Sequence, residues 1–379
     1  MNHFRTRVDA GVRTALLVLC LAVVSSSFIA CSDDSNNPPP TTFERTDLVS
    51  DIPDAAHFTD PNLVNAWGIA ASATGPFWVA DNGTSVSTLY NGDGAPFPLA
   101  SPLVVSIPAP EASSGAGEGE GSLPTGIVFN GTIDFVVTQG DVSGPALFIF
   151  DTEAGTIAGW NPTVNPTNAI TVSDDEDAIY KGLAIGKNGS ANFIYTTNFF
   201  LGEVEVYDKD FAEVDLGGAF DDPNIPEGFA PFGIQNVGGN LYVTYAKQDA
   251  NHEDDVAGPG NGYVDEFDTD GNLIRRFASQ GTLNSPWGLA LAPSSFGTFA
   301  GALLVGNFGD GRINAFNVSS GAFLGQLGNT GGNAVTVPGL WGLIVGNGMA
   351  GGDSDTIYFT AGPDGEEHGL FGSVRPSGS

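Results

Sequence analysis

The residues of this chain best suited to bind a cation lie in one loop rich in carboxylates and amides. Its alternating oxygen-bearing side chains are Asp249, Asn251, Glu253 and Asp255, with Asp254 beside them. Alternating oxygen donors are typical of loops that surround Ca²⁺. Asp254 stands where an EF-hand needs glycine, and Gly260 stands where it needs glutamate. The loop therefore predicts either a calcium site completed by other loops or a solvated acidic segment.

Other reactive chemistry finds less support. After the first thirty residues the only histidines are His57, His252 and His368, and they lack the paired spacing of a zinc site. No Gly-x-Ser-x-Gly elbow is present. Hydrolysis would then depend on a metal, with carboxylate and amide ligands holding calcium against a lactone or phosphoester oxygen.

The elements that position these loops repeat along the chain. Six times a glycine, mostly between apolar residues, opens a short hydrophobic run; these are Gly68, Gly126, Gly182, Gly233, Gly288 and Gly342, spaced 58, 56, 51, 55 and 54 residues apart. Short apolar strands and tight polar turns follow each glycine. A repeat of this length predicts an all-β, six-bladed β-propeller with four antiparallel strands per blade. Glycine suits the innermost strands because they pack closely near the axis.

Individual repeats add further expectations. The sixth repeat lacks a fourth strand, so we expect segment 45–50 to pair with it and close the ring. In the second repeat we expect 133–137 and 146–150 to be the second and third strands. Lys181 stands where other repeats have an aromatic residue. We expect it to pair with the acidic run 174–177 or, alternatively, to face the central channel. The aromatic residues at this position are interpreted as inter-blade packing and are Trp67, Phe232, Trp287 and Trp341.

One face of such a propeller carries the blade-to-blade connections and the loops between second and third strands. We call it the loop face, and every long or irregular segment of this chain falls on it. The default binding site is the central mouth of this face. The candidate residues there are Asn65, Asp81, Asn82, Lys181, Asn198, Asn307, Asp310, Glu367 and His368.

The start of the chain predicts export. Basic residues precede the apolar stretch 15–24, which is too short to span a bilayer core of roughly 30 Å and suits a signal peptide. The stretch leads to Cys31 through a sequence that resembles a bacterial lipobox, so we expect residues 1–30 to be a lipoprotein signal and Cys31 to be lipidated. Plain secretion with cleavage after Ala30 is the alternative. Segment 31–42 is expected to be a disordered, Pro-rich tether, and 43–379 a single propeller domain.

The net charge of the chain limits the classes of partner that it can bind. The chain has 44 acidic and 12 basic residues, a formal net charge of −32. Such a field opposes nucleic acid and anionic lipid. We expect membrane contact only through the anchor at the cell envelope, a monomer, and a small molecule, glycan or protein bound at the acidic face. A halophilic or marine host is another explanation for the charge.

Several stretches carry a family resemblance. Segment 286–290 (PWGLA) is similar to the opening of an NHL repeat. The whole of 43–374 resembles an uncharacterised family of secreted bacterial six-bladed propellers, and the shared stretches are 65–69, 254–262, 306–311 and 359–363. Gluconolactonase- and paraoxonase-like propellers resemble the chain in fold only, because their calcium ligands cannot be matched here. We therefore predict a binding or interaction module. A calcium-dependent hydrolase of small esters or lactones and a structural envelope protein are the alternatives.

Overall fold

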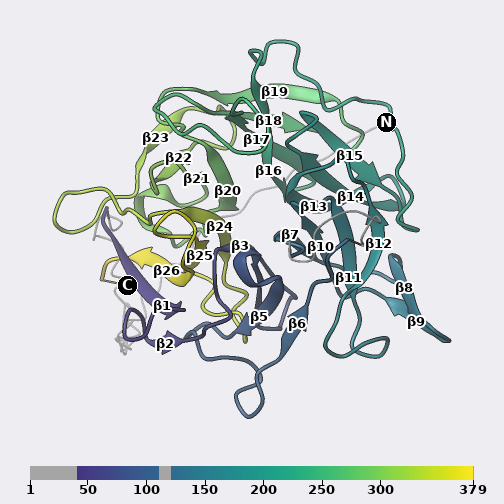
Figure 1. Cartoon of the computed structure of the whole chain (residues 1–379). Helices are drawn as coiled ribbons and strands as arrows, with labels where there is room; N and C mark the ends of the chain where they lie inside the picture. The colour runs from purple at the N-terminus through teal and green to yellow at the C-terminus, as the bar shows by residue number, and fades with distance from the viewer. Residues whose placement is uncertain (1–40, 111–120, 379) are drawn as a thin grey trace, which may run out of the picture. The chain divides into compact units, whose positions relative to one another are not determined.

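The computed structural model describes residues 41–110 and 121–378 (Figure 1). They belong to one compact unit, Pro39–Ser379. The predicted signal peptide, the lipidation of Cys31 and all but the last two residues of the tether lie outside the described residues, so they stay predictions. Within the described ranges, no helix is long and apolar enough to cross a membrane.

Six antiparallel sheets form the blades of a propeller, as predicted (Figure 1). Blade 1 contains β3 (Ala66–Ala71), β4 (Phe77–Asp81), β5 (Val86–Tyr90) and β6 (Val104–Ser106). Blade 2 contains β7 (Pro124–Phe129), β10 (Phe148–Thr152), β11 (Thr156–Trp160) and β12 (Ile170–Asp174). Blade 3 contains β13 (Tyr180–Asn188), β14 (Ala191–Asn198) and β15 (Glu203–Tyr207). Its fourth segment is not a regular strand: an isolated bridge joins Tyr207 to Glu213, and the amide of Val214 donates a hydrogen bond to the carbonyl of Val206 at 2.9 Å.

The last three blades follow the same order. Blade 4 contains β16 (Phe229–Val237), β17 (Asn240–Lys247), β18 (Tyr263–Phe267) and β19 (Leu273–Ser279). Blade 5 contains β20 (Pro286–Leu291), β21 (Leu303–Asn307), β22 (Ile313–Phe316) and β23 (Phe323–Gln326). Blade 6 contains β24 (Leu340–Val345), β25 (Ile357–Ala361) and β26 (Leu370–Pro376). The innermost strand of each blade contacts those of both neighbours, and β24 contacts β3, so the ring is closed.

The beginning of the described chain completes blade 6. Strand β1 (Phe43–Ser50) runs antiparallel to β26 in a register that places Phe43 opposite Pro376 and Ser50 opposite Leu370. The short β2 (Phe58–Thr59) then pairs in parallel with β1. The predicted closure by segment 45–50 is therefore confirmed. It hydrogen-bonds an edge that would otherwise expose unpaired backbone groups.

Blade 2 differs from the prediction. Strands β8 (Val136–Gln139) and β9 (Val142–Pro145) form a separate hairpin outside the blade sheet, and β10 is the second strand. Segment 133–137 is therefore not the second strand, and 146–150 contributes to the second strand rather than the third. Val137 is buried and Val136 is exposed, which is the alternation of a strand. This strand belongs to the hairpin, which packs on the outer part of the blade. In consequence the turn containing Glu153 lies on the loop face.

The glycines of the inner strands allow close contact between blades. A Cβ atom on Gly288 would lie 2.2 Å from the carbonyl oxygen of Trp341, and one on Gly68 would lie 2.4 Å from that of Thr125. Both carbonyls belong to the next blade around the ring. These distances are shorter than a carbon–oxygen contact allows, so the predicted reason for glycine at these positions is confirmed.

Candidate functional site

Two rings of equivalent residues surround the axis at the loop face, one residue from each blade in each ring. The first ring holds the residues that precede the inner glycines, which are Trp67, Thr125, Lys181, Phe232, Trp287 and Trp341. The second ring holds the residues at the ends of the second strands, which are Asn82, Glu153, Phe199, Ala246, Phe308 and Gly362. Polar members come from blades 1 to 3, whereas blades 3 to 6 contribute mostly aromatic ones. We call this region the mouth.

The aromatic residues of the mouth form a buried plug. The ring of Trp341 stacks on Trp67 at 3.6 Å and on Phe308 at 4.0 Å between centroids. Trp287 packs edge-on against both tryptophans, and Phe232 packs edge-on against Trp341. The four members of the first ring, Trp67, Phe232, Trp287 and Trp341, are at most 9% exposed, whereas Phe308 of the second ring is half-buried. The interpretation of the aromatic series as packing between blades is confirmed.

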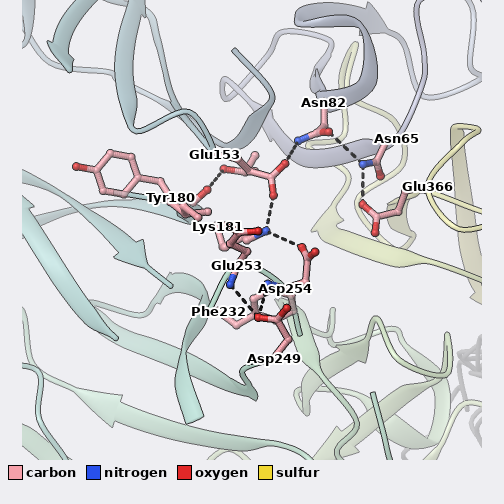
Figure 2. A network of polar contacts seen from close by, with 12 residues as sticks. Asn65, Asn82, Glu153, Tyr180, Lys181, Phe232, Asp249, Glu253, Asp254 and Glu366 are labelled. Atoms are coloured by element: carbon pink, nitrogen blue, oxygen red, sulfur yellow. Dashed lines mark hydrogen bonds and ion pairs between the residues drawn. The ribbon is translucent and has the colours of Figure 1, made fainter. Parts of the chain in front are cut away.

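Lys181 is the one cation in the first ring (Figure 2). Its side chain is 3% exposed, and its ammonium group forms ion pairs with Glu153 and, at 3.5 Å, with Asp254. The same nitrogen lies 5.3 Å from the centroid of Trp67. Burial lowers the pKa of Lys181, but the negative charges of Glu153, Asp254 and Glu366 outweigh burial and raise it above its usual range. The lysine is therefore charged.

The expected pairing of Lys181 with the run 174–177 is wrong. A register shift between Tyr180 and Gly182 marks a bulge at Lys181, which occupies the same ring position as Trp67 in blade 1. The side chain therefore meets acids from other blades, and the alternative expectation, that it faces the channel, describes the structure. The acids it meets stand 28 and 73 positions away in the sequence and approach only through the ring.

A chain of amides connects Glu153 to the other side of the mouth (Figure 2). Asn82 donates a hydrogen bond to Glu153 at 2.8 Å, and Asn65 donates to Asn82 at 3.2 Å. Asn65 also donates to Glu366 at 2.7 Å, while its own carbonyl accepts from the indole of Trp341 at 3.1 Å. Both asparagines are thus fixed by hydrogen bonds. The chain links blades 1, 2 and 6 through side chains alone.

Glu366 lies in the loop between β25 and β26. Its φ of +70° is in the left-handed region, which is costly for a residue other than glycine and is often found at functional sites. At the loop's end, Asp51 contacts the His368 ring nitrogen at 2.7 Å and accepts from the Gly369 amide at 2.8 Å. Burial raises the pKa of Glu366 to about 6; the negative charge of Glu153 also raises it, and the hydrogen bond from Asn65 partly offsets the rise.

The predicted candidates divide into two groups. Those that meet in the mouth network are Asn65, Asn82, Lys181 and Asp254. Those that lie elsewhere are Asp81, Asn198, Asn307, Asp310, Glu367 and His368. Asn198 is buried and donates to Glu205 at 2.6 Å, and Asn307 donates to Asp310 at 3.0 Å. Glu367 is exposed, while its neighbour Glu366 takes the place in the mouth.

The acidic loop 249–255 is closed largely by its own backbone. The Asp249 carboxylate accepts hydrogen bonds from the amides of Asn251 and Glu253 at 3.1 and 3.0 Å. Such a side-chain-to-backbone turn uses an oxygen that a metal would need. Asp255 is half-buried instead. Across residues 41–110 and 121–378, no three His, Cys, Asp or Glu side chains are placed to hold a metal ion. The acidic side chains of the described residues therefore form no such cluster, and the calcium site stays a prediction from the sequence.

Sequence reasoning missed Glu153 and Glu366. Glu153 was missed because the incorrect second strand of blade 2 placed its turn on the opposite face. The apolar run 148–150, followed by the polar turn 151–155, was the signal in the sequence that could have identified the second strand of blade 2. For Glu366, adjacent glutamates gave no means of deciding which side chain turns inward.

Comparison with known proteins identifies relatives of this chain by sequence. No family model matches the chain. "Uncharacterized protein R648" of Acanthamoeba polyphaga mimivirus is 35% identical over 343 residues, covering 88% of this chain and 80% of that protein. "Uncharacterized protein L690" of the same virus is 34% identical over 342 residues, covering 88% and 86%. These relatives are viral, so they give no support to the expected family of secreted bacterial proteins.

Solved structures share the fold at low sequence identity. A protein of unknown function from Bacteroides thetaiotaomicron has a TM-score of 0.50 and 9% identity, covering 88% of this chain and 72% of its own. A streptogramin B lyase has a TM-score of 0.47 and 12% identity, covering 88% and 97%. The likeness to the Bacteroides protein bears on fold alone, and that to the lyase carries no conclusion about this chain. By sequence, this chain belongs to the family of the mimivirus proteins R648 and L690.

Proposed function

We propose that this protein is a binding module whose mouth receives a positively charged group. The observation that carries the proposal is the meeting of three carboxylates from three blades, Glu153, Asp254 and Glu366, around the single cation Lys181. When all four groups are ionised, the carboxylates exceed the cation by two charges. A ligand cation would balance this excess.

Accessibility supports a cationic ligand. The side chain of Asp254 is 78% exposed and that of Glu153 is 19% exposed, whereas that of Lys181 is 3% exposed. A ligand arriving from solvent therefore meets negative oxygens and cannot reach the ammonium group. The amides of Asn65 and Asn82 are engaged in the hydrogen-bond chain and hold the acids in place. The net charge of −32 would also attract cations toward this face.

The positions of the candidate residues on the loop face support a binding function better than a hydrolytic one. Two of the candidate oxygen ligands have separate partners: the side chain of Asn198 donates to Glu205, and the carboxylate of Asp249 accepts from backbone amides of its own loop. A lipid anchor at Cys31, predicted from the first residues, would present the mouth at the surface of a cell envelope. That placement is an inference from the sequence and is independent of the mouth.

Tryptophan fluorescence offers a direct test, because the ammonium group of Lys181 lies over the ring of Trp67, which packs against Trp287 and Trp341. The protein is titrated with N-acetyl-arginine amide, which carries one guanidinium group, and with N-acetyl-citrulline amide, its neutral isostere. We expect saturable binding of the arginine compound only. Asp254→Asn should weaken it about tenfold, the effect of losing about 1.4 kcal/mol from a charged hydrogen bond.

The control is Asp141→Asn, which removes the same charge from the exposed tip of the β8–β9 hairpin. It should leave the dissociation constant unchanged. Equal responses to the arginine and citrulline compounds, or equal weakening by both substitutions, would exclude the mouth as a cation site.

A further inference from the structure

We propose that the ligand of the mouth is a polypeptide segment in which a basic side chain enters the mouth and a neighbouring apolar side chain packs on an adjacent ridge. The ridge consists of Phe200, Leu201 and His252. This inference rests on the proposed function and names the partner of the same site.

The ridge exposes apolar surface on the loop face. Phe200 and Leu201 occupy the turn between β14 and β15 and are 37% and 51% exposed. The ring of Phe200 lies 6.5 Å from that of His252, edge to face. Aromatic and leucine side chains left this open lose contact with water when a partner covers them, which favours binding.

The ridge and the mouth are parts of one loop system. His252 belongs to the segment 249–255 that also supplies Asp254 to Lys181. The side chain of Gln248 donates a hydrogen bond to the carbonyl of Phe199 at 2.6 Å, which joins this segment to the ridge turn. Asp249 closes the segment on itself through backbone amides. Ridge and carboxylate are therefore held in a fixed relation.

This combination favours a polypeptide over a simple cation. A polyamine would engage the carboxylates and leave the ridge uncovered, and no three acidic side chains of the described residues are placed to hold a metal ion. Single exposed apolar residues are ordinary on protein surfaces, but an apolar ridge next to a partly buried carboxylate cluster matches an arginine or lysine flanked by an apolar residue. Arginine and aromatic side chains carry much of the energy in protein interfaces. The surrounding negative charge would speed the approach of a basic segment.

The test compares three peptides by fluorescence titration. These are acetyl-Leu-Arg-Leu-amide, acetyl-Gly-Arg-Gly-amide and acetyl-Leu-citrulline-Leu-amide. Leucine on both sides of arginine allows the chain to bind in either direction. We expect the leucine–arginine peptide to bind about fivefold more tightly than the glycine–arginine peptide, from partial burial of one leucine. The citrulline peptide should not bind measurably.

Substitution of the ridge separates this inference from the proposed function. The double variant Phe200→Ser/Leu201→Ser should lose the fivefold preference and keep the affinity for the glycine–arginine peptide. Ile133→Ser, which removes an 85% exposed side chain next to the β8–β9 hairpin, is the control and should keep the preference.

Each other outcome has one meaning. Equal affinity for the two arginine peptides, or a preference that survives in the double variant, overturns the ridge while the cation site stands. Tight binding of the citrulline peptide contradicts the coupling of ridge and mouth. If none of the arginine compounds binds, the inference and the proposed function both fail.

Discussion

Replacing Asp81 by asparagine should stabilise the protein at neutral pH. Asp81 ends β4 and is fully buried on the side of blade 1 that packs against blade 6. Its carboxylate lies against the hydroxyl and the backbone of Thr88, but no contact of either oxygen has full hydrogen-bond geometry in the part of the chain that the structure describes. Burial raises the pKa of Asp81 well above its ordinary value; the contacts with Thr88 offset only part of this rise, and the negative charge of Asp60 adds to it. The equivalent positions of blades 3 and 5 hold the hydrogen-bonded Asn198 and Asn307.

The sign and size of the effect follow from proton linkage. Unfolded Asp81 ionises at an ordinary carboxyl pKa of about 4, whereas the folded protein retains the proton to higher pH. Because the folded state binds more protons, the free energy of unfolding falls as pH rises between these two pKa values. The slope is about 1.4 kcal/mol per pH unit within this window. Asparagine has no proton to lose, so this part of the slope disappears.

Urea unfolding at several values between pH 4 and 7 measures the effect. The two proteins should have similar stability near pH 4, and Asp81→Asn should become progressively more stable as the pH rises. Comparing each variant with the native protein at one pH cancels the titration of the other acids. Asp141→Asn, at an exposed site, should show no such trend. A difference that does not change with pH, or a variant less stable at pH 7, would refute the reasoning, because it would mean that the folded protein stabilises the charged carboxylate.

Three further substitutions test other parts of the structure. Lys181→Met should lower the free energy of unfolding in urea by about 3 kcal/mol, because it leaves Glu153 without its cation. Adding Glu153→Gln to this variant should restore part of the lost stability. If the losses of the two substitutions add instead, the pairing is contradicted. Binding of N-acetyl-arginine amide should strengthen as pH rises through about 6, where Glu366 ionises, and calorimetry should find this dependence absent in Glu366→Gln. Gly288→Ala should lower the free energy of unfolding by at least about 2 kcal/mol, because its Cβ would meet the Trp341 carbonyl oxygen at 2.2 Å. The control is Gly131→Ala, whose Cβ would face only the movable Phe129 ring and which should lower the free energy of unfolding less. Thermal unfolding measures both variants.

The fold was largely predictable because its determinants are local and repeated. Glycines such as Gly68 and Gly288 are required by contacts that recur in each blade. Closure by β1 followed from counting strands. The error at 133–137 has the opposite origin, since the burial of Phe135 and Val137 is that of a blade strand although they belong to an added hairpin region. Alternation alone does not show which sheet a strand joins.

The site was predictable only in part. Position on the loop face identified Asn65, Asn82 and Lys181, because strand order fixes which turns emerge together. It did not identify the partner of Lys181, since Glu153 comes from the neighbouring blade and is brought close by the ring. Nor could it select Glu366, whose inward direction depends on a left-handed backbone conformation held by distant contacts.

A crystal structure of the protein soaked with N-acetyl-arginine amide would test the central proposal most directly. We predict guanidinium density in the mouth, within hydrogen-bond distance of Asp254 and of Glu153 or Glu366, with Lys181 still beneath. Density for the compound only outside the mouth, or an empty mouth at a saturating concentration, would contradict the account.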